Sequence, residues 1–281
     1  MNKETIFKKI FGDEEPYKDQ KLHDQISQLT RLLEKFLAQK QFEKDKQIRI
    51  LLAVETGSRA WGFASPDSDF DVRFIYAHSK DWYIQLAPER DVIEVPINPV
   101  LDISGWDLRK AMNLANGGNA VIQEWLISPI VYRQHDVLAP LVRQKMDAVF
   151  SAKATYHHYF SMANGMKDDM SGDEVKLKRF FYFTRATLSA QWINEKQSIP
   201  PIEFKLLLAG LTQDQEVSAA FDQLIQAKAQ LGEAEVLSVD PVCFEFVMQA
   251  FKRLMDSDMD SLAPKQQSLD SDDLRQLLGM L

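Results

Sequence analysis

The chain has 281 residues, of which 45% are hydrophobic and 26% charged, an ordinary balance for a globular protein. Its 33 basic and 41 acidic residues leave a net charge of −8, which argues against a large, non-specific nucleic-acid footprint and still allows a local basic patch to recognise a short RNA end. The single cysteine excludes an internal disulfide and a cysteine-rich zinc site, and the lack of a signal-type or membrane-spanning apolar run predicts a cytoplasmic protein without membrane contact.

Three segments in the first quarter of the chain have a clear apolar pattern. Residues 21–38 carry apolar side chains at helical spacing, which predicts an amphipathic helix packed against a sheet. The apolar run Ile48–Val54 predicts a buried strand that ends at the turn Gly57-Ser58. After a short connection, Asp69–Tyr76 predicts a second strand.

The Gly57-Ser58 turn is the predicted phosphate site. Exposed backbone N–H groups in such a turn bind phosphate oxygens, and the Ser58 hydroxyl supplies a further hydrogen bond. Arg59 either adds a charge-assisted contact or is a surface arginine. The alternative for the turn itself is an ordinary end of a strand.

Two carboxylates begin the second strand. Residues two apart in a strand point to the same face, so Asp69 and Asp71 are expected side by side. Adjacent carboxylates repel each other unless one is protonated or a cation lies between them, and Mg²⁺ (or Mn²⁺) prefers such oxygen ligands. We therefore predict that both bind metal and act in catalysis; the alternative is an Asp-rich turn. A phosphate cradle beside a metal-binding carboxylate pair is typical of nucleotidyl transfer from a nucleoside triphosphate.

A third carboxylate is expected on a neighbouring strand. Residues 92–95 and 100–103 predict two short strands, with prolines between them. Asp102 lies in the second of these apolar runs, where a lone carboxylate needs a partner or a metal, so Asp102 is the predicted third catalytic and metal-binding residue. Glu94, on the preceding strand, is the alternative.

Helical patterns dominate the rest of the chain. Ser104 and Asp107 resemble a capping box that starts a helix ending near Ala115. The acidic segment 256–273 predicts a flexible linker, and a short terminal helix then presents a leucine face that docks on the helical half of this chain or, alternatively, on another chain. The other predicted helices cover residues 79–86, 120–126, 140–149, 155–163, 174–194, 203–209, 216–231 and 241–255.

One of these helices carries a candidate ligand face. Lys178, Tyr182 and Arg185 lie at positions i, i+4 and i+7 of the helix that begins near Glu174. Two cations around a tyrosine favour an anion opposite them, so we predict that this face binds the nucleotide through its triphosphate and its base or sugar. The alternative is a solvated basic stripe.

Several strings of residues carry a resemblance to a known group of proteins. Gly57-Ser58 followed by Asp69-x-Asp71 is similar to the signature of the DNA polymerase beta-like nucleotidyltransferase superfamily. The longer context resembles the branch of predicted nucleotidyltransferases assigned to an RNA repair pathway, which implies an RNA 3′ end as the acceptor. The strings that match this branch are Glu55–Gly62, Asp67–Arg73, Gly105–Lys110, Glu124–Tyr132 and Lys178–Tyr182.

These observations predict an α/β (α+β) protein with two main parts. Residues 1–135 are expected to form an N-terminal helix and a small mixed-sheet nucleotidyltransferase domain, and residues 136–256 a helical domain that completes the nucleotide cleft. Residues 257–281 are expected to form the acidic linker and terminal helix. The predicted function is metal-dependent transfer of a nucleoside monophosphate to an acceptor hydroxyl. The alternatives are nucleotidylation of a small molecule or protein, and a non-catalytic nucleotide-binding module.

Overall fold

A computed structural model describes residues 48–65, 68–87, 89–95, 101–171, 175–230, 239–257, 259–265 and 267–281, and within these ranges five strands form one mixed sheet in the order β3-β4-β2-β1-β5. β2 and β4 are parallel, and the other neighbours are antiparallel. The predicted helix over 21–38 lies outside the described residues. The strands are β1 (Arg49–Thr56), β2 (Phe70–Ala77), β3 (Val92–Val95), β4 (Leu101–Asp107) and β5 (Val131–Gln134).

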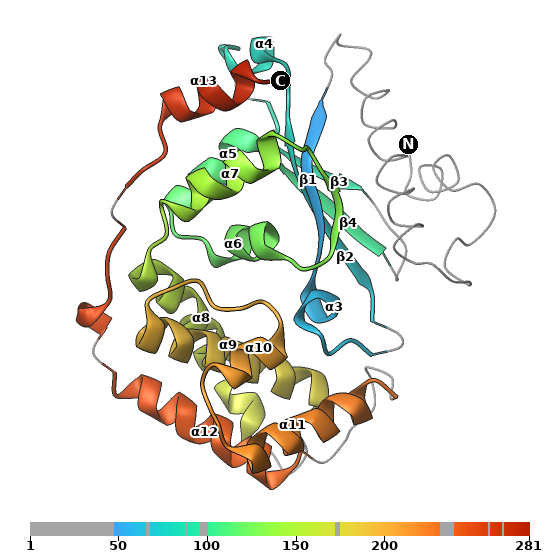
Figure 1. Ribbon diagram of the computed structural model, residues 1–281, viewed down its shortest axis with the longest axis vertical. Helices are drawn as coiled ribbons and strands as arrows, with labels where there is room; N and C mark the ends of the chain where they lie inside the picture. Colours follow the sequence, from blue (N-terminus) through green and yellow to red (C-terminus); the bar gives the residue numbers. More distant parts are fainter. Residues whose placement is uncertain are drawn as a thin grey trace, which may run out of the picture.

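One face of the sheet is covered by α5 (Leu108–Asn116), α6 (Ala120–Ile127) and α7 (Leu138–Asp147), as Figure 1 shows. Alternate residues of a strand point to the same face, so one set of strand side chains meets these helices. The buried members of this sheet-side core include Leu52, Val54, Ile75, Leu108, Met112, Trp125, Leu138, Val142 and Met146. By packing, α7 therefore belongs with the sheet rather than with the helices that follow it.

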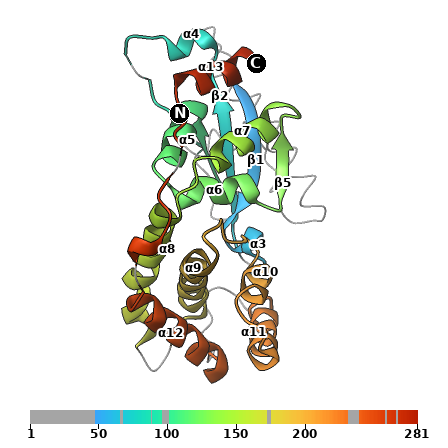
Figure 2. The same ribbon diagram turned by 60° about the vertical axis from the view of Figure 1, so that its left-hand side comes forward.

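The helices beyond the sheet form a second core rich in phenylalanine. In both ribbon views they lie beyond the end of the sheet that carries the short helix α3 (Gly57–Trp61) (Figures 1 and 2). The central helix of this group, α9 (Leu177–Lys196), is buried along most of its length. Its neighbours are α8 (Ala152–Met166), α10 (Phe204–Ala209), α11 (Gln215–Lys228) and α12 (Pro241–Met255). The rings at the centre of this core are Phe180, Phe181, Phe183, Phe204 and Phe221.

The structure corrects the predicted start of α5. Ser104 does not cap a helix, because β4 continues through Ser104 to Asp107 in parallel pairing with β2. Asp107 is itself the cap, and its Oδ1 accepts a hydrogen bond of 2.9 Å from the backbone N–H of Arg109. Pairing with a buried neighbouring strand extends β4 three residues beyond the point where the local capping pattern predicted the helix.

The C-terminal helix α13 (Ser271–Gly279) docks on its own chain. Leu277 and Leu278 are buried in the sheet-side core, and Lys145 Nζ lies 2.6 Å from Asp273 Oδ1. The leucine face packs on α7, which lies within the predicted helical half (136–256) but belongs by packing to the sheet-side core. No helix in the described part of the chain is both long and apolar enough to cross a bilayer. The remaining short helices are α4 (Lys80–Tyr83), η1 (Lys167–Met170) and η2 (Met259–Ser261).

Candidate active site

The end of β1 runs directly into α3, so the predicted phosphate turn is the first turn of a short helix. Gly57 has a φ of +65°, and a Cβ atom at this position would lie 2.3 Å from Oδ2 of Asp71. A glycine is therefore required for the Asp71 carboxylate to lie against this backbone. Ser58 is buried, and its carbonyl accepts hydrogen bonds from the N–H groups of Gly62 and Phe63.

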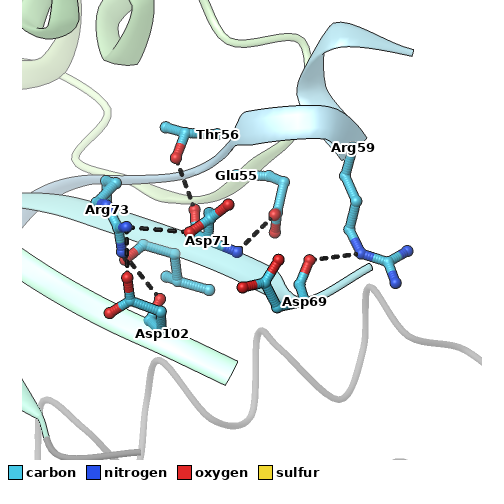
Figure 3. A network of polar contacts seen from close by, with 8 residues as sticks. Glu55, Thr56, Arg59, Asp69, Asp71, Arg73 and Asp102 are labelled. Atoms are coloured by element: carbon cyan, nitrogen blue, oxygen red, sulfur yellow. Dashed lines mark hydrogen bonds and ion pairs between the residues drawn. The ribbon is translucent and has the colours of Figure 1, made fainter. Parts of the chain in front are cut away.

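The three predicted carboxylates meet at this end of the sheet. Asp71 lies in β2, Asp69 directly precedes the strand, and Asp102 of β4 is the register partner of Asp71. Figure 3 shows the carboxylates of Asp69 and Asp71 beside each other. Burial raises the pKa of Asp71 above its usual value; Arg73 and Lys178 oppose the rise, while Asp69 and Asp102 add to it. The site therefore concentrates negative charge that a cation can relieve.

An arginine of this chain already lies between two of the carboxylates. Arg73 Nη2 is 3.0 Å from Oδ1 of Asp71 and 2.6 Å from Oδ2 of Asp102. Asp102 is half-exposed, with 55% of its side chain accessible, so burial does not force it to have a partner; it pairs with Arg73. The alternative third carboxylate, Glu94, is exposed and forms an ion pair of 2.5 Å with Arg90.

The carboxylates suit a hard divalent cation through their donor atoms. Within the described ranges, no group of three or more His, Cys, Asp or Glu side chains is arranged as a metal site. Asp69 and Asp71 still fit as ligands, because they offer adjacent oxygen donors whose repulsion a cation relieves. Asp102 fits only if it exchanges Arg73 for the metal. The set of three ligands thus stays a prediction.

The loop before β2 is held from both sides. Arg59 Nε and Nη2 donate to the carbonyls of Asp69 (3.1 Å) and Ser68 (2.6 Å), and its guanidinium lies 3.5 Å from the centroid of the Phe70 ring. Buried Lys228, from α11, donates to Ser65 Oγ at 2.7 Å. Arg59 thus positions Asp69 through the backbone, and its predicted contact with phosphate stays a prediction.

A buried carboxylate supports Asp71 from β1. Glu55 is fully buried; its Oε1 accepts a hydrogen bond of 2.8 Å from the backbone N–H of Asp71, and its Oε2 accepts one from the Tyr132 hydroxyl. Burial raises the pKa of Glu55 from its ordinary 4.5 to about 7, while the hydrogen bonds from Tyr132 and Asp71 oppose the rise. Glu55 therefore titrates near neutral pH and links the ends of β1, β2 and β5.

The Glu55→Gln variant should be less sensitive to pH than the wild type. The folded-state pKa is raised, so the stabilising effect of protonated Glu55 is complete below pH 4.5 and is lost as the pH rises through about 7. Roughly 3 kcal/mol of wild-type unfolding free energy should disappear across this window, and glutamine should remove that loss. Urea unfolding of both proteins at about pH 5 and about pH 8 measures the difference; parallel pH profiles would contradict it.

The predicted basic face of α9 divides into two environments. Lys178 is close enough to lower the pKa of Asp71, and Tyr182 packs edge-on against Trp61 of α3, with ring centroids 5.0 Å apart. Arg185 is buried and forms an ion pair of 2.9 Å with Glu124 of α6. Its Nε and Nη2 have no acceptor in the part of the chain that the structure describes. Contact of these three residues with a nucleotide stays a prediction.

A protein family matches most of this chain. The RNA repair pathway DNA polymerase beta family, RlaP, matches residues 32–278. The chain belongs to this family. The match confirms the resemblance to polymerase beta-like nucleotidyltransferases that the Gly57-Ser58 and Asp69-x-Asp71 pattern indicated. It spans both the sheet and the helices beyond it, so family membership concerns nearly the whole chain.

Two individual proteins are also similar to this member of the family. The uncharacterized protein YcgL of Bacillus subtilis (strain 168) is 40% identical over 227 residues, which cover 80% of this chain and 87% of the relative. The crystal structure of a nucleotidyltransferase-like protein from Exiguobacterium sibiricum 255-15 aligns with 82% of this chain and 74% of that one, at 10% identity and a TM-score of 0.31.

Sequence reasoning assigned no role to several residues that build the site. Arg73 follows Asp71 by two residues, so strand alternation alone places it on the same face and was the available signal. Glu55 directly follows the apolar run Ile48–Val54, which marks it as a candidate buried carboxylate in need of a partner. Lys228 had no local signal, because its partner Ser65 lies 163 residues away in the chain.

Proposed function

We propose that this protein is a metal-dependent nucleotidyltransferase that moves a nucleoside monophosphate from a triphosphate to an acceptor hydroxyl, with an RNA end as acceptor. The observation that carries the proposal is the contact between Gly57 and the Asp71 carboxylate, beside Asp69. Such a contact is what a phosphate-binding backbone beside a cation-binding carboxylate pair would require. Membership of an RNA repair family supports the choice of acceptor.

Each residue has a distinct task in the proposed reaction. Asp69 and Asp71 would hold Mg²⁺ or Mn²⁺, which would polarise the α-phosphate and lower the pKa of the attacking hydroxyl. The backbone of Gly57 and Ser58 holds phosphate oxygens of the triphosphate. Lys178, whose charge already acts on Asp71, attracts the same phosphates from the side of α9.

The reaction forms one bond and breaks one. The acceptor oxygen attacks the α-phosphorus, the bond from that phosphorus to the β-phosphate oxygen breaks, and pyrophosphate leaves. Asp102 is half-exposed at the edge of the site and is the residue we assign to accept the hydroxyl proton. Glu55 and Arg59 hold the backbone of Asp71 and Asp69 in place.

The test is a transfer screen with labelled triphosphates. The full chain is incubated with Mg²⁺ or Mn²⁺, each of the four α-labelled nucleoside triphosphates, and short RNAs with a free 3′ hydroxyl. Label on the RNA that depends on the metal is the expected result, and the same RNA with a blocked 3′ end is the matched control.

Other distributions of label identify the alternatives. Label on protein or on an added small molecule would show that this molecule, and not RNA, is the acceptor. The proposed nucleotidyl transfer would still be supported. Absence of label on every acceptor, with tight binding of triphosphate retained, would contradict the catalytic proposal and favour a nucleotide-binding module.

A further inference from the structure

Arg73 holds a position that the proposed metal also requires. It lies two residues after Asp71 on the same face of β2, and the parallel register of β2 and β4 places Asp102 directly across from Asp71. The guanidinium turns back toward this pair (Figure 3). One nitrogen, Nη2, contacts Oδ1 of Asp71 at 3.0 Å and Oδ2 of Asp102 at 2.6 Å.

The Arg73 guanidinium is held by several hydrogen bonds and not by a single surface ion pair. Nη1 donates to the carbonyls of Val72 at 3.2 Å and Asp102 at 3.0 Å, so the guanidinium is fixed by side chains and backbone together. Only 18% of the Arg73 side chain is exposed. Charge-assisted hydrogen bonds with this geometry hold a guanidinium in one place.

A metal ion and Arg73 exclude each other at this point. A divalent cation shared by Asp71 and Asp102 would need oxygens of both carboxylates, and Nη2 already contacts Oδ1 of Asp71 and Oδ2 of Asp102. A guanidinium keeps its charge under ordinary conditions, so it releases the site by rotating away rather than by losing a proton.

We propose that Arg73 is an internal substitute for the divalent cation: it holds Asp71 and Asp102 together before the metal binds and leaves when the metal bridges them. The inference rests on the proposed metal dependence and adds a step to it. Asp69 and Asp71 accept metal first, and Asp102 becomes a ligand only after it has exchanged Arg73 for the cation. Arg73 is thus a positioning residue whose release sets the affinity for metal.

The experiment measures binding of Mn²⁺ alone to the full chain, by the electron paramagnetic resonance signal of the free ion. The Arg73→Met variant, which keeps an unbranched apolar stem and removes the competing cation, should bind Mn²⁺ at least about tenfold more tightly than the wild type. The gain should vanish in Arg73→Met/Asp102→Asn. Arg143→Met is the matched control, because it removes the same charge from α7, where Arg143 donates to Leu126 and Gln134.

The outcomes separate this inference from the proposed function. Wild-type binding of Mn²⁺ with equal or weaker binding by Arg73→Met would overturn the role of Arg73 and leave the metal-dependent site in place. Lack of Mn²⁺ binding by both proteins would overturn both. If Arg73→Met does not fold, Arg73→Lys replaces it: one ammonium cannot make all four contacts, so a smaller gain in affinity is expected, and no gain overturns the inference.

Discussion

The Asp69→Asn/Asp71→Asn variant should lose nucleotidyl transfer by at least about a thousandfold. The amides keep the shape of the carboxylates, and Gly57 still admits the side chain at position 71. They remove the two negative charges on which cation binding depends. The rate of label transfer from an α-labelled triphosphate, at saturating metal, measures the loss.

Two controls accompany this variant. Asp260→Asn/Asp272→Asn makes the same change of net charge at side chains that are 89% and 81% exposed in the C-terminal segment, and should retain the wild-type rate. The site variant should still unfold cooperatively on heating, because the two amides remove the repulsion between the carboxylates of Asp69 and Asp71. A transfer rate within about tenfold of the wild-type rate would show that Asp69 and Asp71 do not hold the catalytic metal.

The Arg185→Met variant should lose about 3–5 kcal/mol of unfolding free energy. Arg185 is 4% exposed, its partner Glu124 is 14% exposed, and the guanidinium lies 4.3 Å from the centroid of the Trp61 ring. Removing the cation leaves a buried carboxylate whose remaining donors are the Tyr159 hydroxyl at 2.6 Å and Trp61 Nε1 at 3.3 Å. Urea unfolding at neutral pH measures the change.

A second substitution tests the cause of that loss. Arg185→Met/Glu124→Gln removes both charges and keeps one amide oxygen that can accept from the Tyr159 hydroxyl, so at least about half of the lost stability should return. Lys205→Met breaks an ion pair whose members are 65% and 50% exposed, and should cost less than about 1 kcal/mol. A double variant no more stable than Arg185→Met would show that packing, not the unpaired charge, dominates.

Local pattern predicted most elements because their periodicity reports which face is buried. The strands at 48–54, 69–76 and 92–95 and the helices at 120–126, 203–209 and 241–255 agree with the structure to within two residues at each end. The prediction failed where tertiary pairing overrode local chemistry. β4 continued through a capping pattern because β2 lies beside it, and β5 (Val131–Gln134) was missed because an edge strand this short has little pattern of its own.

The site shows the same division. Asp69, Asp71 and Gly57 are close in the sequence, so strand alternation and turn chemistry alone predicted that they share one end of a strand. The role of Arg185 was less accessible, because its partner Glu124 lies 61 residues away on another helix. A cation on a helix face has the same local pattern whether it meets solvent, a ligand or a buried carboxylate.

The sequence by itself determined the carboxylate pair, the glycine turn before it and the family to which the chain belongs, because these depend on residues within a short segment. Only the tertiary structure decided which charges offset one another: Arg73 with Asp71 and Asp102, Glu55 beneath Asp71, and Arg185 with Glu124. The physical reason is that electrostatic energy depends on distance and burial, and folding sets both between residues far apart in the chain.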